Sequence, residues 1–210
     1  MFSFDPATGI ETVLHSFQND GVDGYGPFAG LSSIHGILYG TTASGGAYNQ
    51  GTVFSLEPAT GTETMLHSFA SGADGAFPVA ELIPLNGVLY GTTYHGGRGD
   101  YGVVFSIDPA SGKESVLHAF GKGMDGSYPQ ADLKDIKGRL YGTTFEGGTS
   151  GSGAVFSINL SIGKEKVLYS FQNNGSEGTQ PVAGLTYVNG ILFGTTSKGG
   201  SGGEGTVFFL

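Results

Sequence analysis

The chain contains no cysteine and no tryptophan, and only 13% of its residues are charged. Without cysteine it can have no disulfide, no thiol nucleophile and no Cys-ligated zinc, and its redox compartment stays undetermined. Nine basic residues stand against 18 acidic ones, for a net charge of −9. Nucleic-acid binding needs a basic patch, so we expect no nucleic-acid partner. No apolar run is long enough to insert into a membrane, and no segment has the pattern of a signal peptide.

Glycine is what the chain has in abundance, with 40 in 210 residues. Such a composition is typical of low-complexity sequence, but 12% aromatic residues and regular apolar runs indicate a packed core. The length suits one all-β domain, residues 1–210.

The sequence repeats itself four times. Leu-Tyr-Gly-Thr-Thr begins at Leu38, Leu89 and Leu140, and the variant Leu-Phe-Gly-Thr-Thr begins at Leu192, with steps of 51, 51 and 52 residues. Repetition at this period, in short strands and tight turns, predicts a glycine-rich β-propeller. The approximate repeats are 1–52, 53–103, 104–154 and 155–206, and residues 207–210 start a fifth copy.

The second repeat predicts four antiparallel strands, the content of one propeller blade. They are expected at residues 80–85, 88–93, 103–108 and 114–120. Asn86-Gly87 predicts a tight turn between the first two, because both positions of a type I′ turn need positive φ. We expect the glycine of Gly-Thr-Thr to let a neighbouring blade approach, and the recurring Phe and Leu to fill the space between blades.

We therefore predict an all-β propeller of four four-stranded antiparallel blades, each of about 51 residues. The chain begins and ends in a third strand, so pairing of its N- and C-terminal strands would close the ring. This count leaves one strand more than four blades need. A monomer is favoured because closure is then local, and half of an eight-bladed homodimer is the alternative.

The motifs together resemble a known family. Leu-Tyr-Gly-Thr-Thr, then Gly-Gly, Gly-Thr-Val-Phe, and Thr-Gly-x-Glu-x-x-Leu-His-Ser-Phe, followed by Asp-Gly and Pro, are similar to the GloVer-type tandem repeat. Residues 51–69 match it closely, and all 210 residues fall within one copy or another. The resemblance implies a bacterial repeat protein with a choice of C-terminal anchor, exported to the extracellular space or cell surface. It carries over no catalytic residue.

Loops that follow the second and fourth strands should share one face of the ring. They differ between copies, and variable loops on a repeated frame are where binding tends to reside. The aromatic residues just before the inter-blade prolines, Tyr25, Phe77 and Tyr128, either pack against the next blade or stack on a sugar. The second repeat adds unique polar residues. The candidate ligand-binding residues are Tyr25, Tyr48, Phe77, His95, Arg98, Asp100 and Tyr128.

Metal binding is considered at two places. Glu81 and Asp132 begin adjacent first strands, so a cation in the axial channel is one interpretation of them. The recurring Asp-Gly of the inter-blade link is either an ordinary turn or part of a calcium loop, and the turn is favoured. We expect no other cofactor.

A recurrent histidine, at His15, His67 and His118, is replaced by Tyr169 in the last copy. Tyrosine keeps a hydrogen-bonding ring but is no substitute for imidazole as a metal ligand or as a proton carrier, which favours a structural role for this position. The Arg98-Gly99-Asp100 tripeptide is attributed to chance, and the Gly-Gly pairs lack the lysine and helix of a phosphate loop.

Three functions remain open. A non-enzymatic binding module, with a glycan or protein ligand on the loop face, is favoured because repetition supplies like groups where catalysis needs unlike ones. The alternatives are an enzyme with its site in the axial funnel around the second repeat, and a purely structural segment of a larger exported repeat protein.

Overall fold

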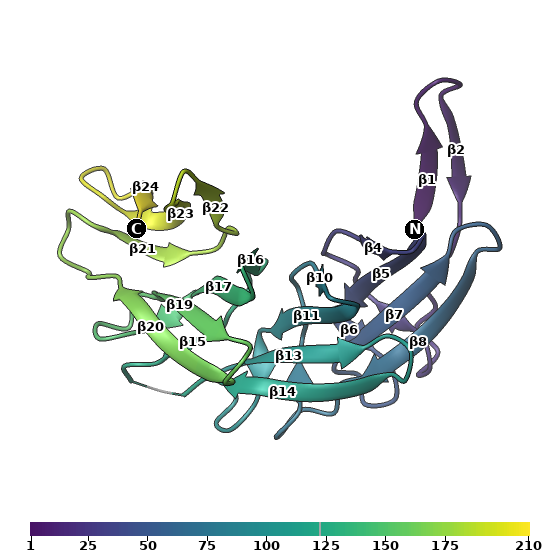
Figure 1. Ribbon diagram of the computed structural model, residues 1–210, viewed down its shortest axis with the longest axis horizontal. Helices are drawn as coiled ribbons and strands as arrows, with labels where there is room; N and C mark the ends of the chain where they lie inside the picture. Colours follow the sequence, from purple (N-terminus) through teal and green to yellow (C-terminus); the bar gives the residue numbers. More distant parts are fainter. Residues whose placement is uncertain (122) are drawn as a thin grey trace.

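Antiparallel strands make up the regular structure of this protein. The computed structural model describes residues 1–121 and 123–210, and in these residues it contains strands and no helix. No helix long and apolar enough to cross a membrane occurs in this part of the chain. Figure 1 shows the sheets standing side by side along a curved arc.

Three complete sheets have four strands each, paired in chain order. Blade 1 consists of β4 (Ser32–Ile34), β5 (Ile37–Thr42), β7 (Thr52–Glu57) and β8 (Thr62–Ser68). Blade 2 consists of β10 (Ile83–Leu85), β11 (Val88–Thr93), β13 (Val103–Asp108) and β14 (Lys113–Ala119). Blade 3 consists of β16 (Lys134–Ile136), β17 (Arg139–Thr144), β19 (Ala154–Asn159) and β20 (Lys164–Ser170).

Blade 4 is a partial sheet. β22 (Thr186–Val188), β23 (Ile191–Gly199) and β24 (Thr206–Phe209) pair in that order, and β21 (Gly178–Pro181) pairs with the end of β23. At the other end of the chain, β1 (Phe2–Asp5) and β2 (Ile10–Val13) form a separate hairpin.

The second repeat agrees closely with its sequence pattern. β11 and β13 have the predicted bounds, and the turn at Asn86-Gly87 has φ of +53° and +79°. β10 is shorter than predicted, and a β-bulge opposite Val104 and Phe105 interrupts the pairing with β14. The short first strands β4, β10 and β16 lie on the concave side of the arc, and β8, β14 and β20 lie on its convex side (Figure 1).

Two-residue strand pairs, which the sequence did not predict, tie each inter-blade link to the loop after the second strand. β3 (Gly24–Tyr25) pairs with β6 (Ser44–Gly45), β9 (Gly75–Ala76) with β12 (His95–Gly96), and β15 (Gly126–Ser127) with β18 (Glu146–Gly147). These pairs set the position of the loop face on which the candidate residues lie.

The core between blades is a row of phenylalanine rings. Phe69, which follows the outer strand of blade 1, meets Phe105 of blade 2 edge-on at 5.1 Å, and Phe120 meets Phe156 of blade 3 in the same way at 5.0 Å. All four side chains are fully buried. Recurring phenylalanines therefore fill the space between blades, as predicted.

The glycine of Gly-Thr-Thr has a different role from the one predicted. Gly91 pairs with Phe105 of its own sheet, and a Cβ added there would lie 2.7 Å from Phe105 Cζ and 2.8 Å from Leu82 Cδ2. The absent side chain thus makes room for a phenylalanine ring of the same blade, and not for the approach of the neighbouring blade.

The predicted ring closure is not seen in this structure. β1 pairs with β2 and β24 pairs with β23, and the two terminal strands are not paired with each other. They stand at opposite ends of the arc in Figure 1. The all-β architecture of four-stranded antiparallel sheets is as predicted, while closure into a four-bladed ring stays a prediction.

Candidate functional site

Five rings gather on the loop face where blade 2 meets blade 3. We call this group the aromatic cluster; it consists of Phe77, Tyr94, His95, Tyr101 and Tyr128. The His95 ring lies 4.8 Å from Tyr94 and 5.6 Å from both Phe77 and Tyr128, in edge-on geometry. Tyr94 and Tyr128 are stacked at 5.0 Å. All five side chains are partly exposed, so the cluster is accessible from solvent.

The backbone holds two of these rings in an unusual conformation. Phe77 and Tyr128 have φ of +56° and +58°, in the left-handed region that bulky residues rarely adopt. The Tyr128 N–H donates to Tyr101 O at 2.8 Å, and its carbonyl accepts the N–H of Phe145 at 3.1 Å. Phe77 is held by the equivalent bonds with Gln50 and Tyr94. Such conformations persist where surrounding contacts over-determine them, and they concentrate at functional sites.

Polar groups border the aromatic cluster. Asp100 Oδ2 lies 3.2 Å from His95 Nδ1, and its Oδ1 accepts the Gly96 N–H at 2.8 Å. Burial, and then the charge of Glu146, raises the pKa of the Tyr94 and Tyr128 hydroxyls, so both stay protonated hydrogen-bond donors at neutral pH.

Two depressions flank the cluster. One, of about 370 Å³, is lined by Phe77, Val79, Tyr94, His95 and Gln130. The other, of about 510 Å³, is lined by Tyr101, Ser127, Tyr128, Glu146 and adjacent loop residues. Each combines ring surface with a few polar groups, which is the usual lining of a small-ligand site.

The structure brings together four of the seven residues predicted to bind a ligand, namely Phe77, His95, Asp100 and Tyr128. Arg98 is exposed in the same loop, and it makes no ion pair within the described residues. Tyr48 is 60% exposed on the corresponding loop of blade 1.

The grouping of Tyr25 with Phe77 and Tyr128 was wrong. Pairing of β3 with β6 places Tyr25 opposite Ser44, which is the register position of Ala76 and Ser127 in the later copies. Gly26 holds the position of the two aromatics, with φ of +70°. Tyr25 instead donates its hydroxyl to Asn49 Oδ1 at 3.0 Å.

Three members of this surface were missed in the sequence, namely Tyr94, Tyr101 and Glu146. A usable signal was the residue after each Gly-Thr-Thr, which is Ala43, Tyr94, Phe145 or Ser197. A position that varies beside an otherwise repeated motif marks a difference between copies.

Glu81 and Asp132 do lie side by side on the concave side of the arc. Asp132 Oδ1 accepts the Glu81 backbone N–H at 2.7 Å, and burial followed by the Asp132 charge raises the pKa of the Glu81 carboxyl. The proximity follows the prediction, and cation binding at this pair stays a prediction.

A second constellation, at the outer edge of the loop face, joins neighbouring blades. Its three copies, which we call the His-Asp-Glu clusters, are His15, Asp23 and Glu63; His67, Asp74 and Glu114; and His118, Asp125 and Glu165. In each, one His nitrogen and one oxygen from each carboxylate lie within 4.8 Å of one another. His and Asp come from the end of one blade and its link, and Glu comes from the outer strand of the next.

These clusters change the interpretation of two motifs. The Asp of Asp-Gly is not only a turn residue, because Asp74 Oδ2 lies 3.1 Å from His67 Nε2 and also accepts the Ala70 N–H at 2.9 Å. The sequence motifs did not indicate that the histidine and the aspartate meet, nor that the glutamate of Thr-Gly-x-Glu joins them.

The pKa values of Asp74 and Glu114, the two carboxyls of the middle cluster, are shifted because the groups are crowded together. Burial acts to raise the pKa of Asp74, but hydrogen bonds from His67 and from backbone N–H groups more than offset it, so the pKa lies below its usual value. Burial, and then the Asp74 charge, raises the pKa of Glu114 to about 7. The pKa values of the two carboxyls of one cluster are thus shifted in opposite directions.

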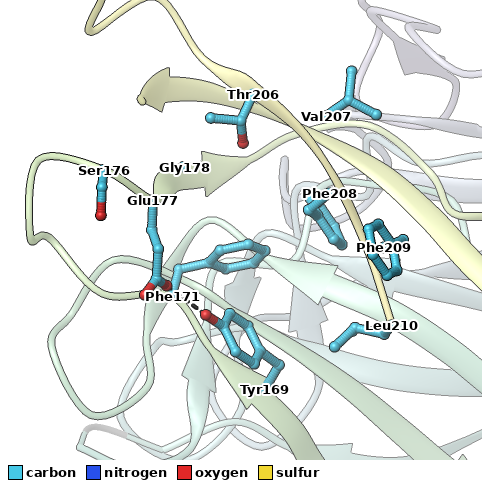
Figure 2. Close-up of a pocket in the computed structure, with 10 residues that line it drawn as sticks. All are labelled: Tyr169, Phe171, Ser176, Glu177, Gly178, Thr206, Val207, Phe208, Phe209 and Leu210. Atoms are coloured by element: carbon cyan, nitrogen blue, oxygen red, sulfur yellow. Dashed lines mark hydrogen bonds between the residues drawn. The ribbon is translucent and has the colours of Figure 1, made fainter. Parts of the chain in front are cut away.

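The last repeat has a different pair in the same place. The Tyr169 hydroxyl donates to Glu177 Oε2, as the dashed line in Figure 2 marks. The pocket around them, about 300 Å³, is lined by Phe171, Phe208, Phe209 and Leu210 among others. It lies along the edge of β24, where β8, β14 and β20 complete the other blades.

Comparison with known proteins agrees with this description. The sequence profile of the Gloeobacter/Verrucomicrobia repeat family matches residues 1–208. A search of curated protein sequences gives no match.

Among solved structures, the nidogen/laminin complex has a similar chain with a TM-score of 0.58 and 14% identity, covering 88% of this chain and 60% of that one. TolB from Acinetobacter baumannii is similar with a TM-score of 0.60 and 16% identity, covering 100% of this chain and 45% of that one. Both neighbours are β-propeller proteins, and this chain spans less than two thirds of the length of either. The likeness concerns the fold, and the profile match over nearly the whole length shows that the chain belongs to the Gloeobacter/Verrucomicrobia repeat family.

Proposed function

We propose that this protein is a non-catalytic binding module that holds a carbohydrate at the aromatic cluster. The observation that carries the proposal is the stacked pair of Tyr94 and Tyr128, partly exposed and backed by His95. Aromatic rings offer apolar faces to the C–H side of a sugar, and precisely placed polar groups beside them meet its hydroxyls. Asp100, Gln130 and Glu146 supply such groups here.

Rigidity supports the same role. Left-handed backbone at Phe77 and Tyr128 is fixed by hydrogen bonds to the loops on either side, so the rings are held in place before a ligand arrives. A preorganised site loses less side-chain entropy on binding than a mobile one.

A glycan array probed with the full chain tests the proposal. Tyr94→Ala and Tyr128→Asn should each lower binding at least tenfold, because each removes one ring of the stacked pair. Asparagine is chosen at position 128 because it tolerates the left-handed backbone there. The matched control is Tyr187→Ala, which removes a 41%-exposed tyrosine on β22. Binding that survives both cluster variants, or that falls equally in the control, would contradict the assignment.

A protein ligand is the second candidate. One structural neighbour comes from a complex of nidogen with laminin, and it covers 88% of this chain. Affinity capture with the wild type and the same three variants separates the two. A captured protein that depends on Tyr94 and Tyr128, together with an empty glycan array, would favour the protein ligand.

We further propose that the arc is completed by pairing at the free edge of β24. Val207 is 77% exposed, whereas its equivalents Val53, Val104 and Val155 are fully buried. Phe2 and Phe4 are 64% and 58% exposed at the other end, where their equivalents in blades 1 to 3 are buried. Docking of the two ends of the arc, on each other or on those of a second copy, would bury these side chains. Closure of the chain on itself gives a four-bladed monomer, and exchange between two copies gives an eight-bladed dimer, which light scattering distinguishes by mass.

A further inference from the structure

The His-Asp-Glu clusters have a chemistry that the proposed binding function does not use. Each one places an imidazole nitrogen and two carboxylate oxygens together where one sheet meets the next, namely the N-terminal hairpin and blade 1, blades 1 and 2, and blades 2 and 3. In all three copies the His Nε2 lies 3.1 Å from the Asp Oδ2. The same arrangement recurs at three successive junctions, which separates it from an accidental meeting of surface side chains.

The histidine and aspartate are both held in place. Asp74 accepts the Ala70 N–H through Oδ2 at 2.9 Å and the Gly75 N–H through Oδ1 at 2.8 Å. The His67 ring packs edge-on against Phe69 at 4.8 Å. In metalloproteins, hydrogen bonds of this kind orient the side chains that bind the metal directly. Two of the three groups are therefore already positioned.

Two of the three glutamates have an oxygen whose hydrogen-bonding capacity is not satisfied. Glu114 Oε1 and Glu165 Oε1 are buried and have no hydrogen-bond partner among the residues that the structure describes. A buried carboxylate oxygen without a donor is costly, and a cation would remove that cost. Two carboxylates on one histidine, without a lysine or arginine among the cluster members, also leave negative charge to be compensated.

We propose that each His-Asp-Glu cluster binds a divalent transition-metal ion of the zinc type. Imidazole nitrogen with carboxylate oxygen suits zinc and its neighbours, whereas calcium takes six to eight oxygen ligands. Ligand atoms around tetrahedral zinc lie about 3.4 Å apart. The His-Asp pair already has nearly that spacing, and the glutamate oxygen lies within 4.8 Å of both partners.

Such an ion links the outer strand of one blade to that of the next. Its ligands come from both sides of the junction, with His67 on β8 and Glu114 on β14 for the middle cluster. Binding therefore stabilises the docking of neighbouring blades, in addition to each blade by itself. In the last repeat Tyr169 and Glu177 replace the His-Asp pair, so we expect three ions per chain.

Titration of the chelator-treated full chain with Zn²⁺, by calorimetry and by metal analysis after desalting, tests the proposal. The wild type should take up three equivalents and show a higher melting temperature with Zn²⁺. Glu114→Gln keeps the side-chain shape and should lower Zn²⁺ uptake to two equivalents. The triple variant, which combines Glu63→Gln, Glu114→Gln and Glu165→Gln, should abolish both Zn²⁺ uptake and the rise in melting temperature.

Two controls match the changes in charge and ring. Glu204→Gln removes an exposed carboxylate, and His35→Asn removes an exposed histidine in a turn where blade 2 has Asn86. Both should retain three equivalents. The proposal would be overturned if the wild type bound no Zn²⁺. It would also be overturned if the triple variant kept its Zn²⁺ uptake while His35→Asn lost it. Circular dichroism of each chelated variant shows that it is folded before the titration.

Discussion

Two contacting residues change together in the last repeat. His67 and Asp74 become Tyr169 and Glu177 at the equivalent positions, and in both cases the ring donates to the carboxylate. The longer glutamate and the phenolic hydroxyl preserve one hydrogen bond with different atoms. Paired variation between internal repeats was therefore a contact signal within a single sequence, and considering the two positions separately concealed it.

The Tyr169-Glu177 bond gives the first prediction. Hydrogen bonding from Tyr169, the largest effect, holds the pKa of Glu177 below its usual value. Tyr169→Phe should raise that pKa toward the ordinary glutamate range, as measured by NMR titration of the Glu177 carboxyl carbon. The native bond stabilises the fold above the unfolded-state pKa, and this contribution is lost as pH falls through the lower folded-state pKa. An unchanged Glu177 titration in the variant would show that the hydroxyl is not its donor.

Gln180 gives the second prediction. It has φ of +57°, its Oε1 is buried without a partner among the described residues, and the first copy has Gly26 in its place. Gln180→Gly should increase the free energy of unfolding by up to about 1 kcal/mol, because glycine adopts this conformation without steric cost. Urea denaturation measures the change. Gln18→Gly, where φ is not in this region, should lower the free energy of unfolding instead. A lower free energy of unfolding in both variants would show that the left-handed backbone at Gln180 is not strained.

At the scale of the element, glycine in a strand is usually a weakness, and here it is required by the ring opposite. In each blade the Gly of Gly-Thr-Thr pairs with the third-strand Phe, as Gly91 does with Phe105 and Gly142 with Phe156. That Phe then meets the Phe that ends the preceding outer strand. The motif Gly-Thr-Thr and the motif Val-Phe are thus two halves of one packing unit.

The third prediction tests this unit. Gly91→Ala places a Cβ 2.7 Å from Phe105 Cζ and should lower the free energy of unfolding by about 2 kcal/mol, the typical cost of overpacking. Chemical denaturation with fluorescence or circular dichroism measures it. Gly202→Ala is the matched control, since a Cβ there meets nothing within 4 Å. Equal stability of the two variants would show that the ring moves aside freely.

On the scale of the whole molecule, the two ends of the arc expose what its middle buries. Every residue of β1 is exposed, whereas the equivalent third strands of blades 1 to 3 are almost entirely buried. In repeat architectures each unit is stabilised mainly by its neighbours, so a unit with one neighbour is the weakest.

Hydrogen exchange provides the fourth prediction. Closure at the β24 edge should protect the amides of β2 as well as those of β8 and β14, because exchange follows local unfolding and a docked strand opens less often. Mass spectrometry of peptides from each blade measures this protection. Exchange of β1 and β2 much faster than that of β8 and β14 would contradict the proposed closure and show that the arc is open in solution.

Short-range chemistry within one repeat was sufficient to predict the blade. Asn86-Gly87 specifies its turn, and the β-branched and aromatic residues of 88–93 indicate β11, because turn geometry and strand propensity are local properties. Internal repetition then implied that the same sheet recurs along the chain.

Tertiary structure alone decided what meets across the junctions. The aromatic cluster joins Phe77 to Tyr128 over a distance in sequence of one repeat, and each His-Asp-Glu cluster joins neighbouring blades. Tyr25 lies two residues before its proline, whereas Phe77 and Tyr128 lie one residue before theirs, and one residue of register turns a side chain to the opposite face of a strand. Contacts of this kind depend on how consecutive sheets are stacked and rotated, and no local pattern encodes that angle.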